Sequence, residues 1–146
     1  MTCMNRLGWC GPLGLALSLA IGPARANVVA VVSVKSAVTT LTKVQLTDIF
    51  LGKANRFPNG APAVPIDQPE GSVAREEFYA KFAGKSAAQV KAFWAKIIFT
   101  GRGQPPKEVA DGIELKKRIA EDPSAIGYID EKIVDDGVRV VLRYRE

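Results

Sequence analysis

The sequence predicts an α/β fold with a mixed central sheet and helices on both faces of that sheet. Residues 28–34 (VVAVVSV) are almost uninterrupted β-branched and apolar, which suits a strand that is covered on both faces. Further along, short apolar segments alternate with segments that carry apolar residues at helical spacing. This alternation is typical of a layered α/β domain.

The first 26 residues are predicted to be a signal peptide. Leu13–Ile21 is an apolar run far shorter than the roughly 20 residues that a membrane-spanning helix needs. Ala24–Ala26 (ARA) fits the small-x-small rule for signal cleavage. We therefore expect export to the periplasm, removal of the signal peptide after Ala26, and a single domain over residues 27–146.

The residues that the expected mature chain lacks restrict its chemistry. It contains no histidine, and both cysteines lie in the signal peptide, which excludes zinc sites, Cys–His dyads and Ser-His-Asp triads. Loss of Arg6 and Arg25 lowers the formal charge from +5 to +3, a mild excess that favours anionic ligands only weakly. We expect no enzyme activity, no catalytic residue, no metal, no cofactor and no nucleic-acid partner.

The first helix is predicted to begin after Thr42, which forms a capping box with Gln45. Gly52 is placed to end this helix in a left-handed conformation. Its apolar face is formed by Leu46, Ile49 and Phe50.

The segment that follows carries the candidate binding site. We expect a strand at Ala63–Ile66, a polar turn at Asp67–Gly71 and a helix that Ser72 caps. The unpaired N–H groups and the dipole at such a helix start attract anions, and Arg75 adds positive charge one turn later. The residues alone leave open that Ser72 only caps the helix and that Arg75 only faces solvent.

A second capping box, formed by Ser86 and Gln89, predicts another helix. Its apolar residues recur at i, i+3, i+4, i+7 and i+8, and are Val90, Phe93, Trp94, Ile97 and Ile98. Core packing is the expected role of this stripe, and lining a ligand pocket is the alternative.

The loop Thr100–Pro106 places Arg102 between two glycines. Such turns can form anion-binding nests, although the simpler interpretation is a flexible surface loop.

The C-terminal part is predicted to contain one helix and two strands. The helix begins at Asp111 and is bounded by Pro123, and the strand Ala125–Ile129 contains Gly127, which permits close backbone approach. Residues 138–144 alternate between apolar and basic, which predicts a half-exposed strand at or near a sheet edge.

Three segments together resemble the periplasmic phosphate-binding proteins of ABC transporters. They are Leu41–Lys53, Val64–Phe78 with its Gly71-Ser72 turn, and Pro123–Ile129. The resemblance implies one lobe of a type 2 periplasmic binding protein, and it is greatest to the short, single-lobe relatives often labelled phosphate ABC transporter substrate-binding proteins. In the two-lobed family the phosphate turn reads Arg-Ser-x-Gly-Ser-Gly-Thr. Here Gln68 stands in place of the arginine and Ala74 in place of the threonine.

The sequence therefore predicts a periplasmic solute-binding module that holds phosphate or a similar oxyanion weakly at a helix N-terminus. The expected ligand-binding residues are Gln68, Gly71, Ser72, Val73, Arg75 and Arg102. We expect a single lobe, so tight binding would require the site to be covered by self-association, by a membrane transporter or by another periplasmic protein. The alternative is a protein-interaction module of the same fold that has lost ligand binding.

Overall fold

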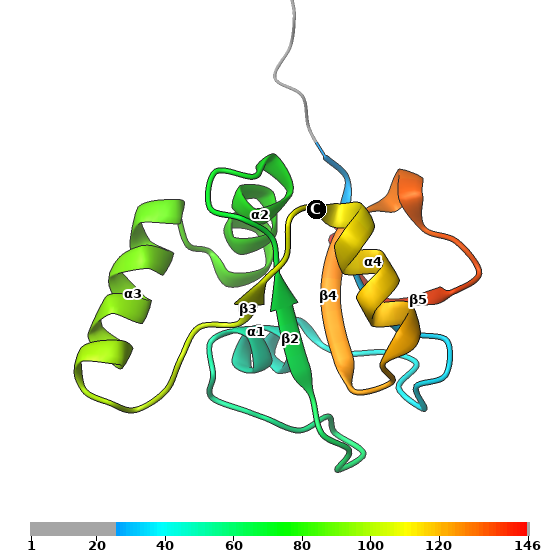
Figure 1. Ribbon diagram of the computed structural model, residues 1–146, viewed down its shortest axis with the longest axis horizontal. Helices are drawn as coiled ribbons and strands as arrows, with labels where there is room; N and C mark the ends of the chain where they lie inside the picture. The colour runs from blue at the N-terminus through cyan, green and yellow to red at the C-terminus, as the bar shows by residue number, and fades with distance from the viewer. Residues whose placement is uncertain (1–25, 146) are drawn as a thin grey trace, which may run out of the picture.

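The computed structural model describes residues 26–145, and the predicted signal peptide lies, except for Ala26, outside them. Along the chain the elements are β1 (Val28–Ser33), α1 (Lys43–Phe50), β2 (Val64–Asp67), α2 (Val73–Phe78), the π-helical turn η1 (Tyr79–Ala83), α3 (Ala87–Phe99), β3 (Lys107–Glu108), α4 (Gly112–Glu121), β4 (Ala125–Asp130), the 3-10 turn η2 (Glu131–Ile133) and β5 (Val138–Arg143) (Figure 1).

The five strands form one mixed sheet in the order β3-β2-β4-β1-β5. Strand β2 pairs in parallel with β3 and β4, whereas β1 pairs antiparallel with β4 and β5. All six residues of β1 are buried, which confirms the strand predicted from its continuous apolar run.

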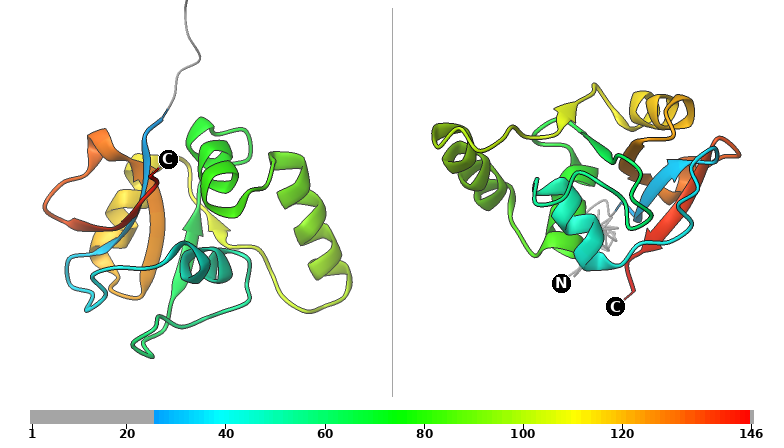
Figure 2. Two further views of the ribbon diagram at one scale, coloured as in Figure 1. Left: turned by 180° about the vertical axis from the view of Figure 1, so that it is seen from behind. Right: turned by 90° about the horizontal axis from the view of Figure 1, so that it is seen from below.

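Helices cover both faces of the sheet, as the sequence predicts (Figure 2). Helix α4 packs Leu115 and Ile119 against one face. The other face carries α1, α2 and η1, whose Phe50, Phe78 and Phe82 are buried in the larger core cluster. None of the helices in residues 26–145 is both long and apolar enough to cross a membrane.

The local signals at the helix ends are confirmed. Both predicted capping boxes form, at the start of α1 and at the start of α3. Gly52, which follows Leu51 at the end of α1, adopts the predicted left-handed conformation with φ of 72°, and Gly84 does the same directly after η1 with φ of 62°.

Two strand predictions need correction. Strand β2 lies one residue later than expected, so Asp67 belongs to the strand and not to the turn. The regular alternation predicted for residues 138–144 is wrong after Val140. The pairing of β5 with β1 shifts there and leaves Val141 as the extra residue, so Leu142 packs beside Val141 on the α1 side and not with Val138 and Val140 on the other side. A β-bulge has this effect because it opposes two residues to one and reverses the faces beyond it.

Gly127 confirms the predicted close approach and supports a first prediction. A Cβ at this position would lie 2.5 Å from side-chain atoms of both Leu115 and Ile119. We expect G127A to lower the free energy of unfolding by about 1–3 kcal/mol, because the well-packed α4–β4 contact must separate. Urea unfolding at unchanged m-value measures this effect.

The matched control is G103A, whose Cβ would meet only Ile97 at an ordinary 3.5 Å. Equal stability of G127A and G103A would contradict the expected overpacking.

Candidate functional site

A cleft of about 260 Å³ lies between α2 and α3, beside the short edge strand β3. One end of it is charged and is formed by the turn before α2, by α2 itself and by Glu108 of β3. The other end is apolar and is formed mainly by α3. The predicted residues Gly71 and Arg75 both line this cleft.

Behind the charged end lies a buried carboxylate. Asp67 is 1% exposed, and it accepts hydrogen bonds from the hydroxyls of Tyr79 (2.7 Å) and Tyr128 and from the backbone N–H of Gln68 (2.9 Å). Burial raises the pKa of Asp67, and these hydrogen bonds and the charge of Arg75 oppose that rise. Burial also raises the pKa of both tyrosines, and the neighbouring carboxylate adds to the effect, so both remain hydroxyl donors.

Arg75 connects this carboxylate to the cleft. Its Nε lies 3.7 Å from Asp67 Oδ2, and its Nη1 donates to the carbonyl of Gln68 at 3.2 Å and to Glu108 Oε1 at 2.6 Å. Burial lowers the pKa of Arg75, but Asp67 and Glu108 outweigh burial and the net shift is upward. Its Nη2 has no partner in residues 26–145 and is not among the buried unpaired atoms. Two N–H donors of a fixed cation therefore remain open to solvent.

The start of α2 is partly used by internal contacts. The hydroxyl of Ser72 accepts from the N–H of Arg75 at 3.4 Å and donates to Gln68 Oε1 at 3.1 Å. Gln68 is 5% exposed, and its Nε2 donates to the carbonyl of Tyr128 at 3.0 Å. No acceptor within the described range meets the N–H groups of Val73 and Ala74, the first two residues of α2.

Of the six predicted ligand-binding residues, Gly71 and Arg75 line the cleft. Ser72 and Val73 lie at the start of α2 but do not line the cleft, and Gln68 is buried and hydrogen-bonded to Ser72. Arg102 is exposed in the loop after α3 and does not line the cleft.

The sequence analysis did not identify the residues that pair or hydrogen-bond with Arg75 and with the turn before α2. Asp67 carried a signal, because it is a carboxylate directly after an apolar strand and before a turn. Glu108 and Tyr128 carried none, since only the pairing of β2 with β3 and β4 brings them to Asp67 and Arg75.

Nearby carboxylates leave the charged end of the cleft with no excess of positive charge. Lys91 lies 3.3 Å from Glu70, and Glu108 pairs with Arg75. Glu76 also lines the cleft. An anion that enters meets two cations but three glutamates, so the net charge of the cleft does not attract it and binding depends on local contact with a cation.

The comparisons with known proteins concern the fold. The chain is similar to a phosphate ABC transporter substrate-binding protein with bound phosphate from Clostridium perfringens, with a TM-score of 0.64 and 23% identity over 80% of this chain and 44% of that one. It is also similar to an ABC-type phosphate transport receptor from Vibrio cholerae (TM-score 0.62, 18% identity, 80% and 45% covered) and to PstS from Borrelia burgdorferi (0.56, 16%, 80% and 46%).

The chain has the fold of one lobe of these proteins. It spans less than half the length of each. No protein-family model matches it, and no curated protein matches it.

The raised pKa of Asp67 gives a prediction for the pH dependence of stability. An unfolded aspartate loses its proton near pH 3.9, whereas the folded Asp67 keeps it to higher pH. The unfolding free energy of the wild type, relative to D67N, should therefore fall as pH rises from about 4, by at most about 1.4 kcal/mol per pH unit. It should level off above the raised pKa.

Urea unfolding of both proteins between pH 4 and pH 7 measures this difference. D136N is the control, because it removes an exposed aspartate that contacts neither tyrosine. A difference that grows with pH would contradict the raised pKa.

Proposed function

We propose that the chain is an exported, periplasmic solute-binding module for phosphate or a similar oxyanion, associated with ABC-type phosphate transport. The observation that carries this proposal is the position of Arg75. Arg75 lines the cleft, and its Nη2 group has no partner in residues 26–145. The N–H groups of Val73 and Ala74, which precede it in α2, also lack an acceptor there. The likeness to phosphate-binding proteins supports the choice of ligand.

Weak affinity follows from the same contacts. The Arg75–Glu108 pair already satisfies part of the guanidinium, and a phosphate has to share it with that carboxylate. The Glu108 side chain is 49% exposed, so solvent and salt screen each charge interaction at this open site. Millimolar affinity is the expected range for the isolated chain.

A protein-interaction module is the second candidate, and the exposed end of α3 favours it. Ile98 is 55% exposed and Phe99 is 92% exposed. Adjacent large apolar side chains on a helix end suit contact with another protein, such as a membrane transporter, another periplasmic protein or a second copy of the chain.

The oxyanion proposal predicts that E108Q binds inorganic phosphate more tightly than the wild type, by up to about fivefold. The gain is small because a partly exposed charge pair contributes only about 0.2–1 kcal/mol. Titration calorimetry at low salt measures both affinities.

E76Q is the matched control, since it removes the same charge from the same cleft but from a glutamate that has no ion pair in residues 26–145. Its effect should be smaller than that of E108Q. Absence of heat with millimolar phosphate, for folded wild type and E108Q alike, would count against oxyanion binding.

The interaction proposal predicts that a pull-down from a periplasmic extract recovers one defined partner, with or without phosphate. F99S should lose that partner, whereas V44S should keep it, because Val44 is similarly apolar and 68% exposed but lies on α1. Equal recovery by both variants would contradict a role for α3.

A further inference from the structure

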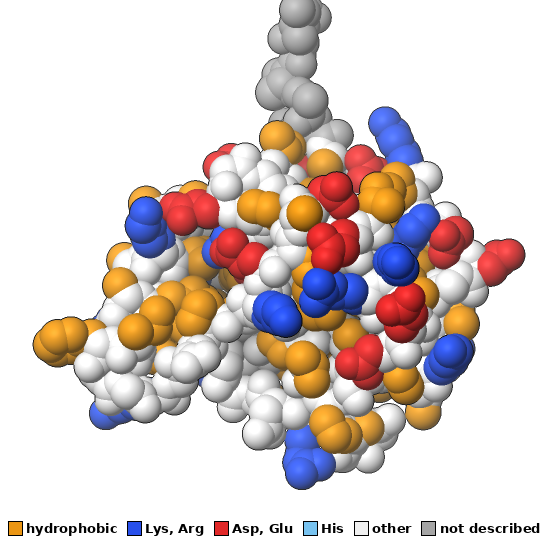
Figure 3. All heavy atoms as spheres, in the orientation of Figure 1, with side chains coloured by type: hydrophobic (Ala, Val, Ile, Leu, Met, Phe, Trp, Pro, Cys, Tyr) orange, Lys and Arg blue, Asp and Glu red, His pale blue; other side chains and the backbone are white. Residues whose placement is uncertain are grey.

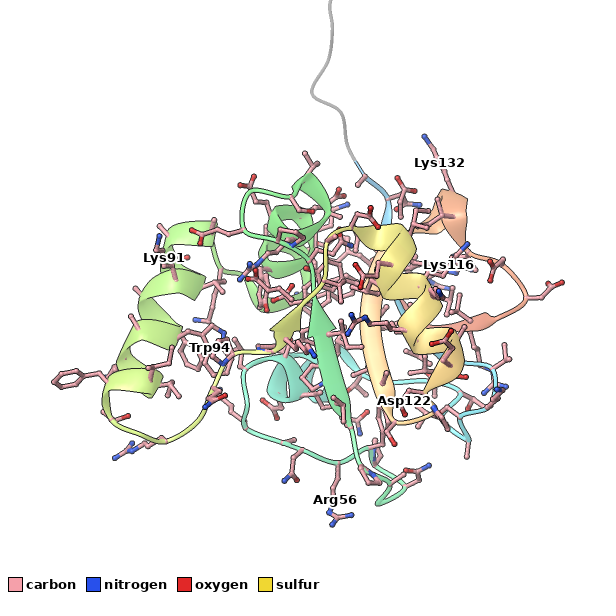
Figure 4. The ribbon with its side chains drawn as sticks, viewed as in Figure 1. Arg56, Lys91, Trp94, Lys116, Asp122 and Lys132 are labelled. Carbon is pink, nitrogen blue, oxygen red and sulfur yellow. The ribbon has the colours of Figure 1, made fainter. Side chains whose placement is uncertain are left out.

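The apolar end of the cleft is larger than an oxyanion needs. Val90 and Trp94 are buried, and they line the cleft together with Ala95, Ile98 and Pro105. Trp94 extends from α3 toward β2 and β3 (Figure 4). Hydrophobic side chains also gather over α3 (Figure 3). These apolar side chains, which we call the apolar wall, offer neither a charge nor a well-placed donor to a small, fully hydrated anion.

The volume of the cleft leads to the same conclusion. An engineered apolar cavity of about 150 Å³ is enough to bind benzene. At about 260 Å³, this cleft has room for a group of that size together with an anionic group at Arg75.

The charges also require a second source of affinity. Arg75 is shared with Asp67 and Glu108, and Lys91 is shared with Glu70. Each methylene group that moves from water to an apolar site strengthens binding by about fourfold. Contact with the apolar wall can therefore exceed what the charged end contributes.

Trp94 adds one further observation. Its Nε1 donor is buried and has no hydrogen-bond acceptor in the described part of the chain. A polar group on a bound molecule that reached this donor would satisfy it.

We propose that the cleft binds organic anions in which a phosphonate, phosphate or carboxylate group is attached to a single apolar substituent. The anionic group lies at Arg75, and the substituent lies against Trp94 and Ile98. The proposal rests on the proposed function for the anionic end, and it adds the class of solute that the rest of the cleft selects.

The test is a calorimetric titration of the whole protein with four probes. Inorganic phosphate, methylphosphonate and phenylphosphonate carry a similar anionic group and differ in the apolar substituent. Benzyl alcohol supplies the ring without the charge. We expect phenylphosphonate to bind at least about tenfold more tightly than inorganic phosphate, with methylphosphonate between them.

Two neighbouring residues of α3 provide a matched pair of variants. I98A shortens a cleft-lining side chain and should weaken phenylphosphonate binding several-fold, with little effect on phosphate. F99A shortens the next side chain, which does not line the cleft, and should leave both affinities unchanged. Both side chains are more than half exposed, so neither variant is expected to unfold the protein.

The outcomes separate this inference from the function on which it rests. Phosphate binding as tight as phenylphosphonate binding, or equal effects of I98A and F99A, would overturn the inference and leave oxyanion binding intact. Equal affinity for benzyl alcohol would overturn it too, because the anionic group would then contribute nothing. Binding of phenylphosphonate without measurable phosphate binding would support the inference and argue against inorganic phosphate as the solute. Failure of all probes with folded protein would overturn both.

Discussion

The buried carboxylate of Asp67 is the interaction on which the site depends. A carboxyl group deep in a protein costs several kcal/mol unless hydrogen bonds replace its water. Tyr79, from the turn after α2, and Tyr128, from the central strand β4, supply those bonds. One side chain of β2 thereby fixes the position of the helical run that begins at Ser72, and with it the cleft.

The same carboxylate determines how Arg75 can act. Held by Asp67, Glu108 and the carbonyl of Gln68, the guanidinium is already ordered before a ligand arrives, so little side-chain entropy remains to be lost. This ordering reduces the positive charge that Arg75 can offer to a ligand, because two carboxylates share the cation. An arginine held in this way can fix the orientation of a ligand, but it contributes little to the affinity. Its remaining Nη2 donors can orient an anionic group, while the affinity has to come from other contacts.

Local sequence signals account for much of the fold and for little of the site. Capping boxes and left-handed glycines act within a few residues, so Thr42, Ser86 and Gly52 could be interpreted from the sequence alone. The bulge at Val141 could not, because it exists only in the pairing of β5 with β1. Glu108 shows the same limit for the site. It lies 33 residues from Arg75, and its role follows from the parallel pairing of β2 with β3.

Helix α3 shows how one apolar stripe can have two roles. Only Val90 and Trp94 of α3 are buried, because the sheet ends at the two-residue strand β3 and no further strand covers the helix. Successive residues of a helix point about 100° apart. Ile98 therefore faces the cleft, whereas Phe99 points away from it and remains 92% exposed. A solute in the cleft would therefore lie against Ile98, whereas a protein partner at Phe99 would occupy a different surface of α3.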